Sequence, residues 1–221
     1  MSTVGIMPDF SKKLFVATPS CRDWKAEFGN SIVRLSSHLT GKFIRGEIQG
    51  LLIGNQVTSL LSLGREILLE TAFKSGSTHI LWIDDDTKFE TSAVDSLLSR
   101  DMDYVAANMV RKQFPIENIA CGFDGKPVSS VCKSGIEEVF HVGLGMTLIN
   151  LDVLREIPVP RFEIKWAPEL KTYRGEDVFL CERLRANGVK LFIDHDASQL
   201  VSHIGDFYYE TPKPAAERKV A

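Results

Sequence analysis

The segment from His79 to Asp86 constrains the fold more than any other part of the sequence. It reads His-Ile-Leu-Trp-Ile-Asp-Asp-Asp, an apolar run too short for a helix that ends abruptly in three aspartates. Such a short continuous run is typical of a strand buried on both faces. In parallel α/β sheets, ligands bind beyond the carboxyl ends of the strands. The segment therefore predicts a buried strand whose end carries carboxylates at a ligand-binding edge.

Short apolar runs alternate with helical patterns along the chain, which favours an α/β fold with a mainly parallel central sheet flanked by helices. Residues 1–210 are predicted to form this single domain, and 211–221 a mobile C-terminal tail. The polar segment 113–138 is interpreted as loops and a short hairpin. Strands are predicted at 14–18, 43–53 (as a strand or hairpin), 79–84, 104–110, 139–150, 189–194 and 199–203, and helices at 24–39, 58–74, 92–99 and 175–187, with a further short helix capped by Asp152.

Composition excludes several classes of function. The chain of 221 residues has a formal net charge of −3, so no basic surplus commits it to nucleic acid or anionic lipid. It has neither a signal-peptide pattern nor 18 continuous apolar residues, which predicts a cytoplasmic protein without a membrane span. The cysteines at 21, 121, 132 and 181 are dispersed, and we expect reduced, buried thiols rather than disulfides or a zinc site.

Asp84, Asp85 and Asp86 concentrate negative charge that is costly unless a partner neutralises it. A divalent cation is one such partner, because Mg²⁺ and Mn²⁺ prefer oxygen ligands and accept substrate phosphates in their coordination shell. The alternative is an acidic, solvated turn before a helix. The spacing does not match an EF-hand calcium loop.

Two later positions are also candidates for chemistry. Glu176 and Asp177 open a predicted helix, where a carboxylate either serves as a general base for an acceptor hydroxyl or merely interacts with the helix dipole. His203 lies in a predicted strand, as a metal ligand or as a hydrogen-bonded structural histidine.

Gly143 and Gly145 lack the third glycine and the strand-then-helix setting of a dinucleotide fingerprint, so a nicotinamide site is rejected. No phosphate-loop motif is present in the sequence. The two glycines mark either a close approach of ligand or backbone, or a plain strand bulge.

Taken in order, these motifs resemble the nucleotide-diphospho-sugar transferases of the GT-A fold, particularly compact bacterial and phage-type members. The resemblance extends over about residues 14–205. Its stretches are Leu14-Phe-Val-Ala-Thr-Pro19, Gly64-Arg-Glu-Ile-Leu-Leu-Glu-Thr-Ala72, His79-Ile-Leu-Trp-Ile-Asp-Asp-Asp86, Val142-Gly-Leu-Gly-Met-Thr-Leu-Ile149, Arg174-Gly-Glu-Asp-Val-Phe-Leu-Cys-Glu-Arg-Leu184 and Val201-Ser-His-Ile-Gly205.

The resemblance implies a role for each position. It implies metal-dependent glycosyl transfer, with Mn²⁺ or Mg²⁺ held by Asp86, Asp84 and His203. Asp177 is implied as the catalytic base, with Glu176 as its alternate. For the nucleotide-sugar donor, it implies contacts of Thr18 and Pro19 with the nucleotide base and of Asp84 or Asp85 with the ribose. Arg65 is implied as a basic contact of the donor. Gly143 and Gly145 are implied near the transferred sugar or the acceptor.

The substrates stay open at this level. A uridine-diphosphate sugar is the commonest donor in such families, and a modified DNA base or a glycan is a possible acceptor. Two alternatives are a nucleotide-sugar or metal-binding module without turnover and a sugar-nucleotide pyrophosphorylase. The pyrophosphorylase is disfavoured because Thr18 to Asp23 contains no glycine.

Overall fold

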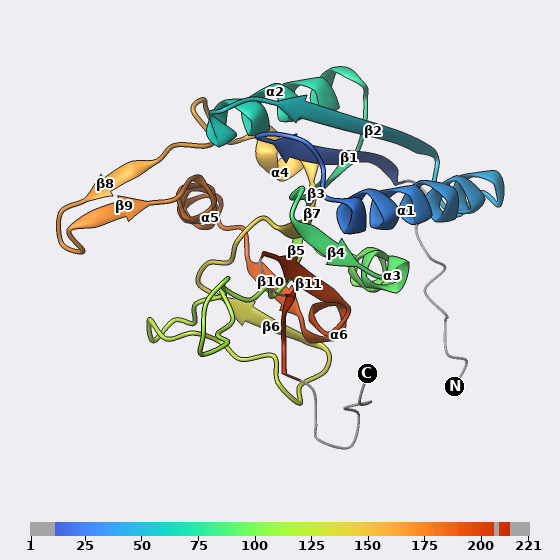
Figure 1. The fold of residues 1–221 in the computed structure, drawn as a ribbon. Coiled ribbons are helices and arrows are strands. Elements are labelled where there is room, and N and C mark those ends of the chain that lie inside the picture. Colours follow the sequence, from blue (N-terminus) through green and yellow to red (C-terminus); the bar gives the residue numbers. More distant parts are fainter. Residues whose placement is uncertain (1–11, 206–207, 213–221) are drawn as a thin grey trace, which may run out of the picture.

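The computed structural model describes residues 12–205 and 208–212, which form an α/β fold around one seven-stranded sheet (Figure 1). Five strands run in one direction, whereas β7 and β6 run antiparallel to their neighbours. In spatial order the strands are β2 (Gly50–Val57), β1 (Lys13–Ser20), β3 (His79–Ile83), β7 (Met146–Asn150), β5 (Tyr104–Ala107), β10 (Leu191–Asp194) and β6 (Ile136–Val139).

Helices cover both faces of this sheet. One face packs against α1 (Ala26–Ile44), α3 (Thr91–Ser99) and α6 (His195–Ser198), and the other against α2 (Leu61–Lys74), α4 (Leu151–Arg155) and α5 (Glu176–Ala186). No helix in the described part of the chain has the length and apolar character needed to cross a bilayer.

Burial on both faces explains why the central strands are continuously apolar. In β1, Leu14 and Val16 pack into one core cluster and Phe15 and Ala17 into the other. All four side chains are at most 2% exposed. A fully buried Leu or Phe side chain contributes roughly 1.5–3 kcal/mol, so a polar substitution on either face of this strand is costly.

Two small sheets complete the fold. In one, β11 (Val201–Ile204) lies between β12 (Tyr208–Glu210) and β4 (Thr87–Phe89), with antiparallel pairing on both sides. The other is the hairpin of β8 (Lys165–Ala167) and β9 (Thr172–Arg174), which projects from the body beside α5 (Figure 1). The ladder between β4 and β11 joins the segment after β3 to residues 201–203.

The predicted α/β alternation is confirmed, with corrections at element boundaries. Residues 43–53 are not one strand or hairpin, because α1 continues to Ile44 and β2 starts only at Gly50. The run 139–150 divides into the end of β6 and the whole of β7. Gly76 and Gly188 take positive φ angles one residue beyond the C-caps of α2 and α5, as is common for glycine at helix ends.

Smaller details also differ from expectation. The cap of α4 is Asn150, whose side chain accepts from the Asp152 backbone N–H at 3.0 Å, so Asp152 is not the cap. All four cysteines are free, but Cys21 and Cys132 are exposed and only Cys181 is buried. Thr211 is buried and bonded to Asn118, while residues 213–221 of the predicted tail lie outside the described residues.

A buried ion pair fixes the end of β10. The Asp194 carboxylate is fully buried, accepts from Arg100 at 2.9 and 3.0 Å and from Ser96 at 2.6 Å, and caps the first turn of α6. Burial raises the pKa of Asp194, but the hydrogen bonds from Arg100 and Ser96 outweigh it, and the net pKa lies below the ordinary value. The stabilisation is therefore present above the ordinary pKa and is lost as the pH falls through the lowered one.

We expect Asp194→Ala to lower the free energy of unfolding at neutral pH by about 3 kcal/mol, because it removes the buried partner of Arg100, which keeps its ion pair with Asp196, and removes a helix cap. Urea unfolding followed by circular dichroism measures the change. Asp152→Ala, at an aspartate whose side chain is 85% exposed, is the matched control and should change little. Equal losses in the two variants would contradict this assignment.

Candidate functional site

The candidate residues meet at the carboxyl edge of the central sheet. β3 ends at Ile83, and β7 begins opposite it at Met146 because the two strands are antiparallel. The Asp84 N–H donates to the Gly145 carbonyl at 3.0 Å, which joins the aspartate segment to the Gly143–Gly145 loop. Tertiary structure thus places the predicted glycines against the acidic segment, as a ligand-approach role requires.

Arg65 lies at the centre of the site on α2, where it is only 1% exposed. Its Nη2 donates to Asp84 Oδ1 at 2.9 Å and its Nε to Glu176 Oε1 at 3.2 Å. The guanidinium also lies 5.4 Å from the centroid of the Trp82 ring. A buried cation needs paired anions, and Arg65 meets that need by linking the end of β3 to the start of α5.

Arg65 keeps one unused donor. Its Nη1 is buried and has no hydrogen-bond partner in the described part of the chain. A buried unsatisfied donor usually marks an ordered water or a ligand. Arg65, which the resemblance implies as a contact of the nucleotide-sugar donor, therefore lies beside the acidic segment. Its main partners are the protein carboxylates of Asp84 and Glu176.

The three aspartates occupy different environments. Burial raises the pKa of Asp84, opposed by the charge of Arg65. Burial also raises the pKa of Asp85, and the nearby charge of Asp86 adds to it, while the Ser20 hydroxyl donates to the Asp85 carboxylate. Asp84 is therefore paired with Arg65 on α2, and Asp85 is hydrogen-bonded to Ser20 at the end of β1. Asp86 faces β11 instead.

Asp86 is the third carboxylate, and it contacts His203. Its Oδ1 lies 3.3 Å from His203 Nε2, and its Oδ2 lies 2.5 Å from Lys112 Nζ. The backbone produces this meeting, since His203 pairs with Thr87 across β4 and β11 and the Ile204 N–H donates to the Asp86 carbonyl at 2.6 Å. Burial raises the pKa of Asp86, but the hydrogen bonds with His203 and Lys112 prevail and lower it to about 2.

The second nitrogen of His203 fixes the orientation of the ring. Nδ1 lies 2.9 Å from the Val110 carbonyl oxygen, which can only accept, so Nδ1 carries a hydrogen. In the protonated ring, Nε2 donates its hydrogen to Asp86 Oδ1. In the neutral ring, Nε2 directs a lone pair at that oxygen, and the contact is attractive only when a cation lies between the two atoms. Metal-binding histidines commonly have this arrangement, with the other ring nitrogen donating to a backbone carbonyl.

The predicted three-residue metal set is assembled only in part. Asp86 and His203 are in contact, but Asp84 Oδ1 is held by Arg65. Across residues 12–205 and 208–212, no three His, Cys, Asp or Glu side chains form a group that could hold a metal ion. A cation bound here would have Asp86 and His203 as its protein ligands and would take its remaining ligands from substrate or water.

Asp177 lies in the first turn of α5, with Arg65 and Asp84 among its charged neighbours. Its Oδ1 accepts from the Val178 N–H at 2.7 Å, whereas its Oδ2 faces Gly143, where an added Cβ would lie 3.4 Å away. Burial raises the pKa of Asp177, and the charge of Glu176 raises it further. A Cβ at Gly175 would lie 2.6 Å from Asp177 Oδ1, so a larger residue there would displace the Asp177 carboxylate from its observed position.

Thr18 and Pro19 are buried at the end of β1, next to β3. Thr18 Oγ1 is a buried hydroxyl with no partner in the described residues, while the Thr18 carbonyl accepts from Asn55 at 2.9 Å. They lie close to the acidic edge, since the next residue, Ser20, is hydrogen-bonded to Asp85. Their role at a nucleotide base stays a prediction.

Sequence reasoning missed two residues of this site. Ser20 accepts from Asn55 at 2.7 Å and from Trp24 at 3.0 Å and is hydrogen-bonded to Asp85. Lys112 lies in the loop after β5, where a basic residue in a polar stretch carries no periodic or motif signal. Both are recognised only from their contacts in the folded chain.

Comparison with known proteins shows the fold alone. No family model matches the sequence, and no curated protein matches it. Among solved structures, the crystal structure of A197 from STIV is similar, with a TM-score of 0.56 and 16% sequence identity. The match covers 94% of this chain and 98% of that chain. The chain therefore shares a single-domain α/β architecture with a protein that differs at most positions.

Proposed function

We propose that this protein is a metal-dependent glycosyltransferase of the GT-A fold, which moves a sugar from a nucleotide-diphosphate donor to an acceptor hydroxyl. The observation that carries the proposal is the contact of Asp86 with His203, on the same sheet edge as the half-buried carboxylate of Asp177. It supports a site in which one side binds the cation and the phosphates and the other side accepts the proton.

Asp86 and His203 hold the cation, Mn²⁺ or Mg²⁺, in this proposal. The oxygen and imidazole ligands suit these ions, and the Val110 carbonyl fixes the histidine ring so that Nε2 faces the site. When bound, the cation acts as a Lewis acid that stabilises the negative charge on the departing nucleoside diphosphate.

Asp177 is the general base. Its raised pKa makes the carboxylate a better proton acceptor, and its Oδ2 faces the Gly143 backbone rather than another side chain. The acceptor hydroxyl gives its proton to Asp177 as its oxygen attacks the sugar carbon and the bond to phosphate breaks. Arg65 and Glu176 position this base by fixing the start of α5 against β3.

The hairpin β8–β9 supplies the acceptor side. It leads directly into α5 and borders a cleft of about 210 Å³, whose walls include Trp166, Phe179 and Arg174. Arg174 is itself neutralised by Glu169 and Glu182. The exposed ring of Trp166 and the half-buried ring of Phe179 beside paired charges suit a polar, largely uncharged acceptor such as a glycan.

Thermal stability measured with nucleotide-diphosphate sugars tests the donor site. We expect uridine-diphosphate sugars to raise the melting temperature more with Mn²⁺ than without it, because a ligand that binds only the folded state stabilises it. Asp86→Asn should abolish the metal-dependent part. Asp124→Asn, at an exposed aspartate of another loop, should retain it. If no nucleotide sugar stabilises the wild-type chain, the donor assignment is wrong.

Asp177→Asn separates binding from chemistry. The amide keeps the shape of the side chain but accepts no proton, so donor stabilisation should persist while transfer falls by at least about 100-fold. Release of nucleoside diphosphate, measured with and without acceptor, gives the rate. Full transfer by this variant would remove Asp177 as the base.

Glu176→Gln tests the electrostatics of that base. Its negative charge raises the pKa of Asp177, so the neutral amide should lower that pKa. A base works when deprotonated, and the acid limb of kcat/KM against pH should therefore move to lower pH. Glu182→Gln on the same helix is the control, and its limb should not move. A limb that stays in place in Glu176→Gln contradicts the coupling.

A further inference from the structure

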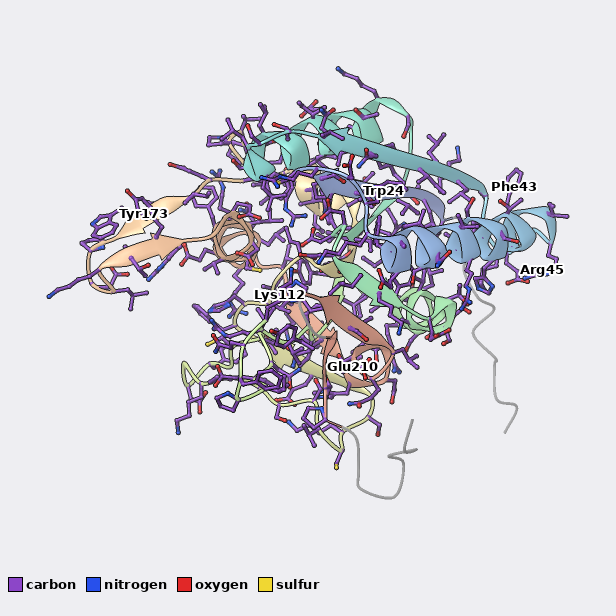
Figure 2. The ribbon with its side chains drawn as sticks, viewed as in Figure 1. Trp24, Phe43, Arg45, Lys112, Tyr173 and Glu210 are labelled. Atoms are coloured by element: carbon purple, nitrogen blue, oxygen red, sulfur yellow. The ribbon has the colours of Figure 1, made fainter. Side chains whose placement is uncertain are left out.

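Lys112 makes an ion pair that the proposed mechanism leaves without a role. Its ammonium lies 2.5 Å from Asp86 Oδ2, while His203 takes the other carboxylate oxygen at 3.3 Å. The side chain comes from the loop after β5 and is 35% exposed. Figure 2 labels Lys112 near the middle of the molecule, between α5 and β11. A flexible, partly solvated cation therefore covers the carboxylate proposed to bind a metal.

The ammonium and a divalent cation compete for the same oxygen atoms. Asp86 is flanked by Lys112 and His203, and a cation bound to the carboxylate would stand close to the lysine nitrogen with the same sign of charge. Like charges in contact repel. Lysine is a compact point charge on a flexible stem, so it can leave Asp86 without moving the backbone.

The nearby basic residues are committed to other partners. Arg65 is buried and bonded to Asp84 and Glu176. Arg111, directly before Lys112, is 53% exposed at its side chain and pairs with Glu117 at 3.5 Å. Of these three basic residues, Lys112 is therefore the one that can exchange Asp86 for an incoming anion at the same point.

We propose that Lys112 is an internal counter-ion of Asp86 that is displaced when a divalent cation binds and then binds an oxygen of the donor's diphosphate. The inference rests on the proposed function and assigns a second charge to the phosphate side of the site. Empty, the site keeps Asp86 neutralised and ordered. Loaded, the same ammonium adds a charge-assisted hydrogen bond to phosphate.

The displacement predicts two opposite effects of one substitution. Lys112→Met keeps the aliphatic stem and removes the charge. Titrated with MnCl₂ alone in a calorimeter, it should bind Mn²⁺ about threefold more tightly than the wild type, because a partly exposed ion pair no longer competes. Titrated with inorganic pyrophosphate at saturating Mn²⁺, it should bind about tenfold more weakly, because one charge-assisted hydrogen bond is lost.

Arg111→Met is the matched control, since it removes the same charge one residue away. It should leave both dissociation constants near the wild-type values. Lys112→Arg, which restores a cation, should recover pyrophosphate binding. A Lys112→Met protein that matches the wild type in either titration overturns the inference, and so does an equal loss of pyrophosphate binding in Arg111→Met.

The proposed function fails in a different way. If the wild-type chain binds neither Mn²⁺ nor pyrophosphate, and Asp86→Asn changes nothing, the metal site itself is wrong and Lys112 loses its role with it. If Asp86→Asn abolishes Mn²⁺ binding while Lys112→Met behaves as wild type, the metal assignment stands and only the displacement is wrong.

Discussion

The buried guanidinium of Arg65 is the interaction on which the site depends. It links Asp84 at the end of β3 to Glu176 at the start of α5. Without it, the carboxylates of Asp84 and Glu176 would meet in a largely buried place with no compensating charge. Burying uncompensated charge costs several kcal/mol. The same contact sets the environment of Asp177, whose neighbours are Glu176, Arg65 and Asp84.

The other half of the site depends on backbone pairing. The ladder between β4 and β11 places His203 against Thr87, and the histidine ring then reaches the carboxylate of Asp86. A ladder of backbone hydrogen bonds holds the two side chains in register more rigidly than loops would. The two halves face each other over Gly143 and Gly145, where the missing side chains leave room beside both Asp177 and Asp84.

Many of the strands and helices that form the site are predictable, because the sequence patterns that indicate them lie within short segments. The apolar run before Asp84 indicates a strand with an acidic end, and the spacing after Gly175 indicates a helix that opens with two carboxylates. Three- and four-residue elements such as β4, α6 and the hairpin β8–β9 escape prediction, since so few residues show no periodicity. The exposure of Cys21 and Cys132 also escaped it, because burial depends on what packs above a side chain.

The sequence by itself determined the alternation of elements, the acidic end of β3 and the residue types suited to cation and proton chemistry, because hydrophobic period and side-chain chemistry are properties of short segments. Only the tertiary structure decided which carboxylate each cation takes. Arg65 claims Asp84, whereas His203 and Lys112 share Asp86, since strand pairing and helix packing bring together residues that lie far apart along the chain. Distance in space, which sets the strength of every charge interaction, is decided by the fold.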